Sequence, residues 1–182
     1  ASLLDEKIES IKQQAGSQKV DIIAHSMGGL VARDYIADAG RAGKVRKLFA
    51  LGAPHLGAVD AIKKLVYGGC LTPIKIPLGR LCVGVSPSEV KDVIQNMISG
   101  YELAPSQEYF NFYNGQDNNH PYPYNINDQS LNYDQIKSFL TNLNYNTSLF
   151  APSELFHALD NSLTNTNGVD VVNIAGSGLP TL

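Results

Sequence analysis

Residues 20–36 read VDIIAHSMGGLVARDYI, and this stretch decides the fold. A short apolar run, Val20 to Ala24, opens it, and its hydrophobicity is continuous rather than alternating. Such a run is typical of a strand in a parallel sheet that is covered on both faces. The chain then turns at Ser26, and the pattern predicts a helix over residues 28–39 that ends at Gly40. The stretch therefore predicts a strand, a tight turn and a helix.

The segments around this stretch extend the same pattern. Apolar residues at helical spacing predict an amphipathic helix over residues 3–15, and apolar runs predict further strands at 45–51 and 169–175. Helix and strand alternate, so we expect an α/β fold with a doubly wound, mostly parallel sheet, formed by residues 1–57 and 166–182. Three such strands leave two apolar edges open, so we expect the chain to be cut at both ends.

Residues 58–165 differ in character, with short helices between loops rich in Gly, Pro and Asn and no convincing strand. We expect this segment to form a helical cap inserted into the core, over the carboxyl edge of the sheet. Helices are predicted at 58–67, 134–143 and 153–164. The strongest helix signal starts at Ser86, which is followed by a proline in the first turn and by a glutamate that completes a capping box.

After this capping box, aliphatic residues from Val90 to Ile98 form a stripe along one face of the predicted helix. Two interpretations remain open. The stripe either packs onto the core, as most such stripes do, or forms a lid that touches a lipid surface transiently.

The composition of the chain excludes several classes of protein. Its 182 residues are 43% hydrophobic and 17% charged, which predicts a folded globular unit. The net charge is −3 with no basic run, so nucleic acid is not an expected partner. We expect no transmembrane helix and no signal peptide within the chain, although a removed signal peptide leaves no trace. Nothing indicates a metal or an organic cofactor, and two cysteines are too few for a zinc site.

Cys70 and Cys82 lie in one Gly- and Pro-rich stretch, YGGCLTPIKIPLGRLC. A loop in this stretch would bring the two thiols close enough to form a disulfide. Such a disulfide would indicate an oxidising compartment and favour secretion. The alternative, two unrelated thiols, stays open, because spacing alone does not establish pairing.

The turn itself, Ala24-His25-Ser26-Met27-Gly28, resembles the nucleophile elbow of α/β-hydrolases, G-x-S-x-G, with Ala24 in place of the first glycine. The resemblance implies that residues 1–57 and 166–182 form a partial α/β-hydrolase core. It also implies that Ser26 is the nucleophile and adopts a strained, positive-φ conformation. We expect no room for a side chain at Gly28. The backbone N–H of Met27 is the expected oxyanion donor, aided by the positive end of the following helix.

A second segment supports the first. Residues 48–58, LFALGAPHLGA, resemble the LGTPH-type loop of lipases, including lecithin–cholesterol acyltransferase-like proteins, and the segments ELAPSQEYF and GSGLPT are also similar to that group. The resemblance implies a serine lipase or esterase that acts on carboxylic esters through an acyl-serine intermediate. An acyltransferase of the same fold, or a hydrolase-fold protein that binds without catalysis, remains an alternative. The substrate would be an ester or a lipid.

The histidines fit the role of general base poorly. His55 follows a neighbouring strand, so it is a candidate for lining the substrate pocket and a weaker candidate for the base. His25 is adjacent to Ser26 and points elsewhere, while His120 and His157 lie in the cap segment as exposed or packed side chains.

The carboxylates fit no better, because Asp21 and Asp170 open their strands, at the edge opposite Ser26. The resemblance implies that the catalytic Asp and His lie beyond Leu182, so residues 1–182 alone should show no appreciable turnover. The sequence does not indicate an oligomeric state.

Overall fold

The computed structural model describes residues 2–70, 73–76, 79–82, 84–114, 125–126, 129–159 and 166–176. Over these residues the chain divides into two compact units, one of Ala1–His55 with Leu159–Leu182 and the other of Leu56–Ala158. The corresponding ranges predicted from the sequence are 1–57 with 166–182, and 58–165. Each unit has a hydrophobic core of its own.

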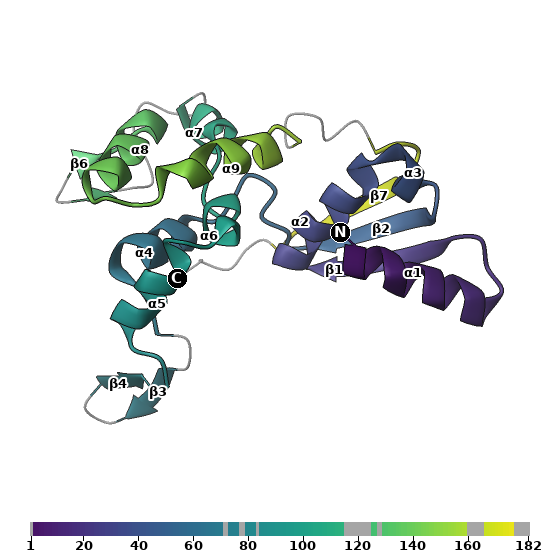
Figure 1. The fold of residues 1–182 in the computed structure, drawn as a ribbon, viewed down its shortest axis with the longest axis horizontal. Helices are drawn as coiled ribbons and strands as arrows, with labels where there is room; N and C mark the ends of the chain where they lie inside the picture. Colours follow the sequence, from purple (N-terminus) through teal and green to yellow (C-terminus); the bar gives the residue numbers. More distant parts are fainter. Residues whose placement is uncertain are drawn as a thin grey trace. The chain divides into compact units, whose positions relative to one another are not determined.

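The first unit contains a parallel sheet of three strands in the order β1 (Val20–His25), β2 (Val45–Leu51) and β7 (Asp170–Ile174) (Figure 1). Ala24 of β1 lies opposite Ala50 of β2, and Ala50 lies opposite Asn173 of β7. The carboxyl ends of all three strands therefore meet at one edge, and the predicted α/β class with a parallel sheet is confirmed.

Helices α1 (Ser2–Ala15), α2 (Met27–Ala37) and α3 (Ala39–Ala42) share one core with the sheet. Ile8 of α1, Tyr35 of α2 and Leu48 of β2 are almost completely buried there. The sequence predicts one helix over residues 28–39, but the helix is interrupted at Asp38. Asp38 has extended backbone angles and accepts a hydrogen bond from the amide of Arg41, so it ends α2 and caps α3.

The opposite face of the sheet is open in the described part of the chain. Ile23 of β1 is 76% exposed and Ile174 of β7 is 49% exposed. The expectation that Val20 to Ala24 is covered on both faces is therefore wrong for the described residues. A continuous apolar run shows that both faces of a strand are apolar, but it does not identify the segment that covers each face.

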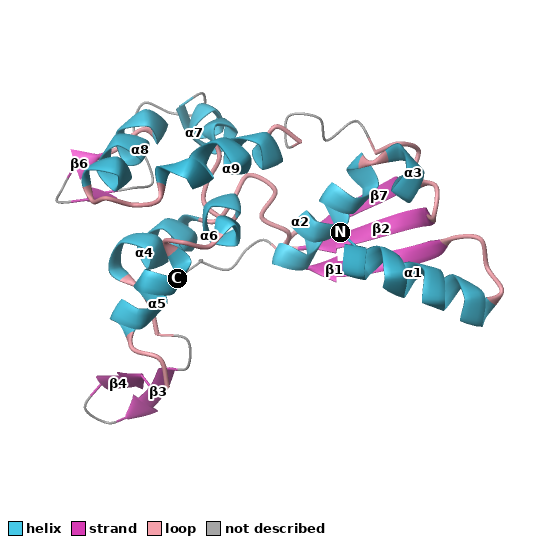
Figure 2. Ribbon diagram, viewed as in Figure 1, coloured by secondary structure: helices cyan, strands magenta, loops and turns pink. Residues whose placement is uncertain are grey.

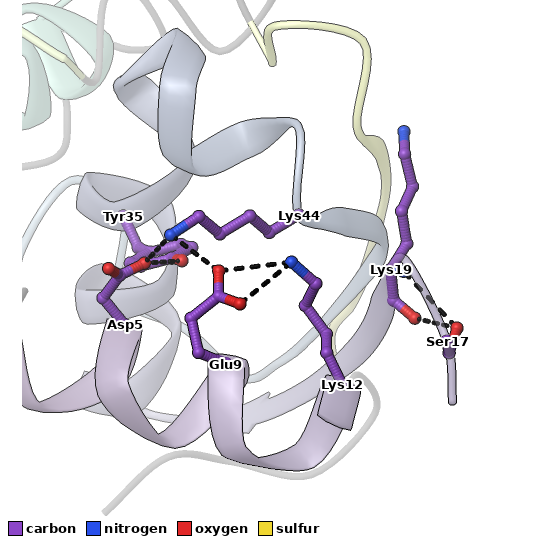
Figure 3. Close-up of polar contacts among 7 residues, drawn as sticks. All are labelled: Asp5, Glu9, Lys12, Ser17, Lys19, Tyr35 and Lys44. Carbon is purple, nitrogen blue, oxygen red and sulfur yellow. Dashed lines mark hydrogen bonds and ion pairs between the residues drawn. The ribbon is translucent and has the colours of Figure 1, made fainter. Parts of the chain in front are cut away.

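A cluster of charged side chains attaches α1 to the loop that leads into β2 (Figure 3). Lys44 Nζ lies 2.6 Å from an Asp5 carboxylate oxygen and 2.9 Å from Glu9 Oε1. The Tyr35 hydroxyl donates a hydrogen bond of 2.6 Å to Asp5. The hydrogen bonds from Lys44 hold the pKa of both carboxyls below their ordinary values, and burial raises the pKa of Tyr35 to about 12.

Replacing Lys44 by methionine should lower the stability of the protein in a pH-dependent way. Carboxyls with lowered pKa values stabilise the fold above their ordinary values, 3.8 for Asp5 and 4.5 for Glu9, and this contribution is lost as pH falls through the lowered values. We expect a lower urea midpoint than wild type at neutral pH and a difference that shrinks in acid. Lys19→Met, at an exposed lysine, is the matched control; equal midpoints of the Lys44 variant and wild type at neutral pH would contradict the account.

A second polar contact attaches the approach to β7 to the end of α2. The side-chain amide of Asn167 donates hydrogen bonds of 2.9 Å to the carbonyls of both Ile36 and Ala37. These carbonyls belong to the last turn of α2, so they accept no hydrogen bond from a backbone N–H within the helix. The contact therefore fixes where the chain enters β7, which lies next to β2 at the edge of the described sheet.

The second unit is mostly helical (Figure 2). Its helices are α4 (Val59–Tyr67), α5 (Pro87–Ile94), α6 (Ile98–Glu102), α7 (Gln107–Asn114), α8 (Tyr133–Asn142), the 3₁₀ helix η1 (Thr147–Leu149) and α9 (Phe150–His157). The helices predicted at 58–67 and 134–143 are confirmed as α4 and α8. The helix predicted at 153–164 starts earlier, as α9, and α7 was not predicted.

Helix α5 begins as the sequence predicts. The Ser86 side chain accepts a hydrogen bond from the Glu89 amide, the Glu89 carboxylate accepts one from the Ser86 amide, and Pro87 occupies the first turn. The helix stops at Ile94, however, and the chain is extended at Met97 before α6 begins. The stripe from Val90 to Ile98 is therefore divided between two helices.

The second unit also contains two short antiparallel hairpins. The first pairs β3 (Pro73–Ile76) with β4 (Gly79–Cys82), and the second pairs β5 (Asn125–Ile126) with β6 (Gln129–Ser130). They correct the expectation that residues 58–165 contain no strand. Among the described helices, none has the length and apolar character that crossing a membrane requires.

Candidate active site

Ser26 is held in a strained conformation between β1 and α2. Its φ of 53° and ψ of −129° lie where only glycine is common, which confirms the predicted positive φ. Its backbone N–H donates a hydrogen bond of 2.9 Å to the carbonyl of Leu51, the last residue of β2. The serine is therefore fixed by its backbone at the carboxyl edge of the sheet.

The first turn of α2 presents unpaired backbone donors beside this serine. Met27 is the first residue of the helix, so its amide has no acceptor within the helix, and its side chain is 50% exposed. The Ser26 hydroxyl makes no cap and no hydrogen bond with the part of the chain that the structure describes. A half-buried serine whose hydroxyl has no hydrogen-bond partner among the described residues thus lies next to the positive end of a helix.

Close packing at this turn depends on Gly29 rather than on Gly28. A Cβ atom added at Gly29 would lie 2.4 Å from the Cβ of Ala53, which follows β2. A Cβ at Gly28 would meet no described atom within 4 Å. The expectation that Gly28 has no room for a side chain is therefore wrong, because the first turn of α2 contacts the sheet through the next residue.

His55 also lies after β2, but it does not contact the serine. Its Nε2 lies 3.1 Å from Oδ1 of Asn173 on β7, and its Nδ1 is buried without a hydrogen-bond partner among the described residues. Both residues line a cavity of about 260 Å³ in the first unit, and Ser26 does not. A substrate-binding role for His55 stays a prediction.

The other candidate groups lie elsewhere. His25 is exposed, His157 belongs to the second unit and is buried there, and His120 lies outside the described residues. Asp21 forms an ion pair with Arg46, and hydrogen bonding to this guanidinium lowers the pKa of Asp21. Asp170 pairs with Lys47 at 2.7 Å. Both carboxylates thus lie near the amino ends of their strands, as the sequence predicts, and each is paired with a basic side chain. Among the described residues, no group of three or more His, Cys, Asp or Glu is arranged to hold a metal ion.

Comparison with known proteins identifies the family to which this chain belongs. The model of the family described as "Lecithin:cholesterol acyltransferase" matches residues 2–150. The chain belongs to the lecithin:cholesterol acyltransferase family. This confirms the resemblance seen in the sequence, and the match includes Ser26, Met27 and His55.

One solved structure, described as "The crystal structure of Tle4-Tli4 complex", is also similar to this member of the lecithin:cholesterol acyltransferase family. The identity is 18% and the TM-score 0.48, and the alignment covers 85% of this chain. It covers 37% of the other chain, so this chain spans well under half the length of that protein. No curated protein gave a significant match.

Two contributors to the site were not predicted from the sequence. Gly29 and Asn173 owe their roles to contacts with residues that follow β2, and neither belongs to the serine motif. The pair of glycines at 28–29 was the available sequence signal for Gly29. Nothing in the sequence indicates a role for Asn173.

Proposed function

We propose that this chain carries the nucleophile of a serine esterase or lipase, with Ser26 attacking the carbonyl carbon of a carboxylic ester. The proposal rests on the strained serine at the start of α2, since strained backbone conformations of non-glycine residues cluster at active sites. Membership of the lecithin:cholesterol acyltransferase family supports it.

The reaction would proceed in two steps. The Ser26 oxygen bonds to the carbonyl carbon and passes its proton to a general base, and the tetrahedral oxyanion accepts a hydrogen bond from the Met27 amide. The carbon–oxygen bond to the alcohol then breaks, and the alcohol leaves with the proton. In the second step a water oxygen bonds to the carbonyl carbon of the acyl-serine, and the base takes a proton from this water. The ester bond to Ser26 then breaks, the serine oxygen receives the proton, and the acid leaves. No described side chain makes a hydrogen bond with the Ser26 hydroxyl, so no residue is assigned as the general base.

Apolar side chains on the second unit favour a lipid as the substrate. Val93 is 55% exposed and Met97 is 45% exposed, although Val90 in the same stripe is buried. The stripe thus contributes to the core with one part and leaves another open to a transient contact with a lipid surface.

Acyl transfer is the second candidate, because the matched family is described as an acyltransferase family. The test is to supply the full-length protein with a radiolabelled acyl ester in water, with and without a long-chain alcohol. Hydrolysis predicts that label appears as free acid in both cases, whereas transfer predicts that it appears as a new ester when the alcohol is present. Formation of neither product would exclude both proposals and favour a binding protein.

An oxidising compartment is the proposed location. Cys70 is disulfide-bonded, and Cys82 is the only other cysteine in the sequence, although its side chain lies outside the described residues. Such bonds persist outside the cytosol. Alkylation of the unreduced, folded protein followed by mass measurement should therefore find no free thiol. Two alkylated cysteines would remove this support for secretion.

A further inference from the structure

We propose that His55 and Asn173 form a positioning pair that holds the turn after β2, and through it the first turn of α2, in the geometry that Ser26 needs. The inference rests on the proposed function of Ser26. It assigns His55 a role through the backbone of the site rather than a contact with substrate.

The pair ties the turn to the sheet. With Asn173 Oδ1 as the acceptor, His55 Nε2 carries the proton and donates across 3.1 Å. Asn173 lies opposite Ala50 in the register of β2 and β7, so its position is fixed by the strand ladder. The backbone N–H of His55 also donates to the carbonyl of Ala53 at 3.0 Å. His55 therefore anchors a short turn through both its side chain and its backbone N–H.

This turn supports the first turn of α2. The space beside Gly29 is filled by Ala53, whose Cβ lies 2.4 Å from where a Cβ of residue 29 would be. The Ser26 amide bonds the carbonyl of Leu51, two residues before Ala53. A shift of the turn would therefore move the Ser26 backbone and the Met27 amide together, because interiors this closely packed transmit small displacements.

The geometry distinguishes this role from the other two that His55 can have. As a general base, His55 would need a free nitrogen beside the Ser26 hydroxyl, but Nε2 is bonded to Asn173 and Nδ1 is buried. As a substrate contact, it would be expected in a cavity shared with Ser26, whereas the cavity that it lines does not include Ser26.

The test compares kcat and KM of the full-length protein for a p-nitrophenyl ester among His55→Phe, Asn173→Val, the double variant and His55→Gln. Misplacing a catalytic group by about 1 Å costs on the order of 100-fold, so we expect each single variant to lose roughly 10- to 100-fold in kcat with little change in KM. The double variant should lose no more than either single variant. His55→Gln, whose amide can donate to Asn173, should recover most of the rate.

Three results would overturn the proposal: losses that multiply in the double variant, a rise in KM with kcat unchanged, or wild-type kcat in Asn173→Val. Asn173 is exposed, so its variant keeps the test decisive if His55→Phe does not fold. Ser26→Ala is measured alongside. If that variant keeps wild-type activity, the proposed function fails; if it is inactive while the pair variants are fully active, only the positioning role fails.

Discussion

Ser26→Ala is expected to lower kcat of the full-length protein for ester hydrolysis by a factor on the order of 10⁴–10⁶, because the residue that forms the acyl intermediate is lost. The stability of the fold should change little, since the Ser26 hydroxyl makes no hydrogen bond with described residues that its loss would disturb. The comparison uses p-nitrophenyl esters of several chain lengths.

A change in folding must be separated from a change in chemistry. Ser17→Ala, in the loop between α1 and β1, is the matched control and should retain wild-type kcat. Its hydroxyl bonds only the backbone of Lys19. The Ser26 variant should unfold at the same temperature as wild type or slightly higher. Activity that survives in Ser26→Ala would contradict the serine mechanism.

Gly29→Val is expected to have the largest effect on the fold. A single Cβ at this position already approaches Ala53 Cβ to 2.4 Å, and the branched side chain of valine adds two more carbons. Overpacking typically costs about 1–3 kcal/mol for small insertions, so Gly29→Ala should lower the free energy of unfolding by about this amount and Gly29→Val by more. Urea unfolding followed by circular dichroism measures both.

Two controls localise this effect. Gly28→Ala should be neutral or slightly stabilising, since its Cβ would meet no described atom within 4 Å and alanine favours a helix. Ala53→Gly should restore stability to Gly29→Ala, because it removes the colliding methyl group. Equal destabilisation by the alanine variants at 28 and 29 would contradict the account, because helix propensity favours alanine at both positions and only a Cβ at residue 29 would meet Ala53.

The sequence predicts the part of the fold that is local. The strand ending at His25, the turn at Ser26 and the helix after it follow from a contiguous pattern, and the start of α5 follows from the capping box at Ser86. Residue types within a few positions determine both features, so reasoning from one sequence is sufficient there.

The ends of helices were predicted less well, for a physical reason. Apolar spacing continues through Met97, but its extended backbone divides the stripe into α5 and α6. Asp38 likewise ends α2 by capping the next helix. Side-chain periodicity reports which face is apolar, whereas a break depends on local hydrogen bonds that compete with the helix.

Contacts between distant segments explain what the sequence did not reveal at the site. His55 and Asn173 are 118 positions apart. The contact between Gly29 and Ala53 joins a helix to a turn that follows another strand. Neither pair has a sequence signature, because each becomes visible only when the parallel register is known.

The most direct test of the account is covalent labelling of the full-length protein with a fluorophosphonate, followed by digestion and mass mapping. Attack by the serine oxygen breaks the phosphorus–fluorine bond and leaves a stable phosphonyl ester on the nucleophile. We predict one adduct, on the peptide that contains Ser26, and none in Ser26→Ala. An adduct on another residue, or the absence of any adduct in protein that hydrolyses esters, would contradict the assignment of Ser26 as the nucleophile.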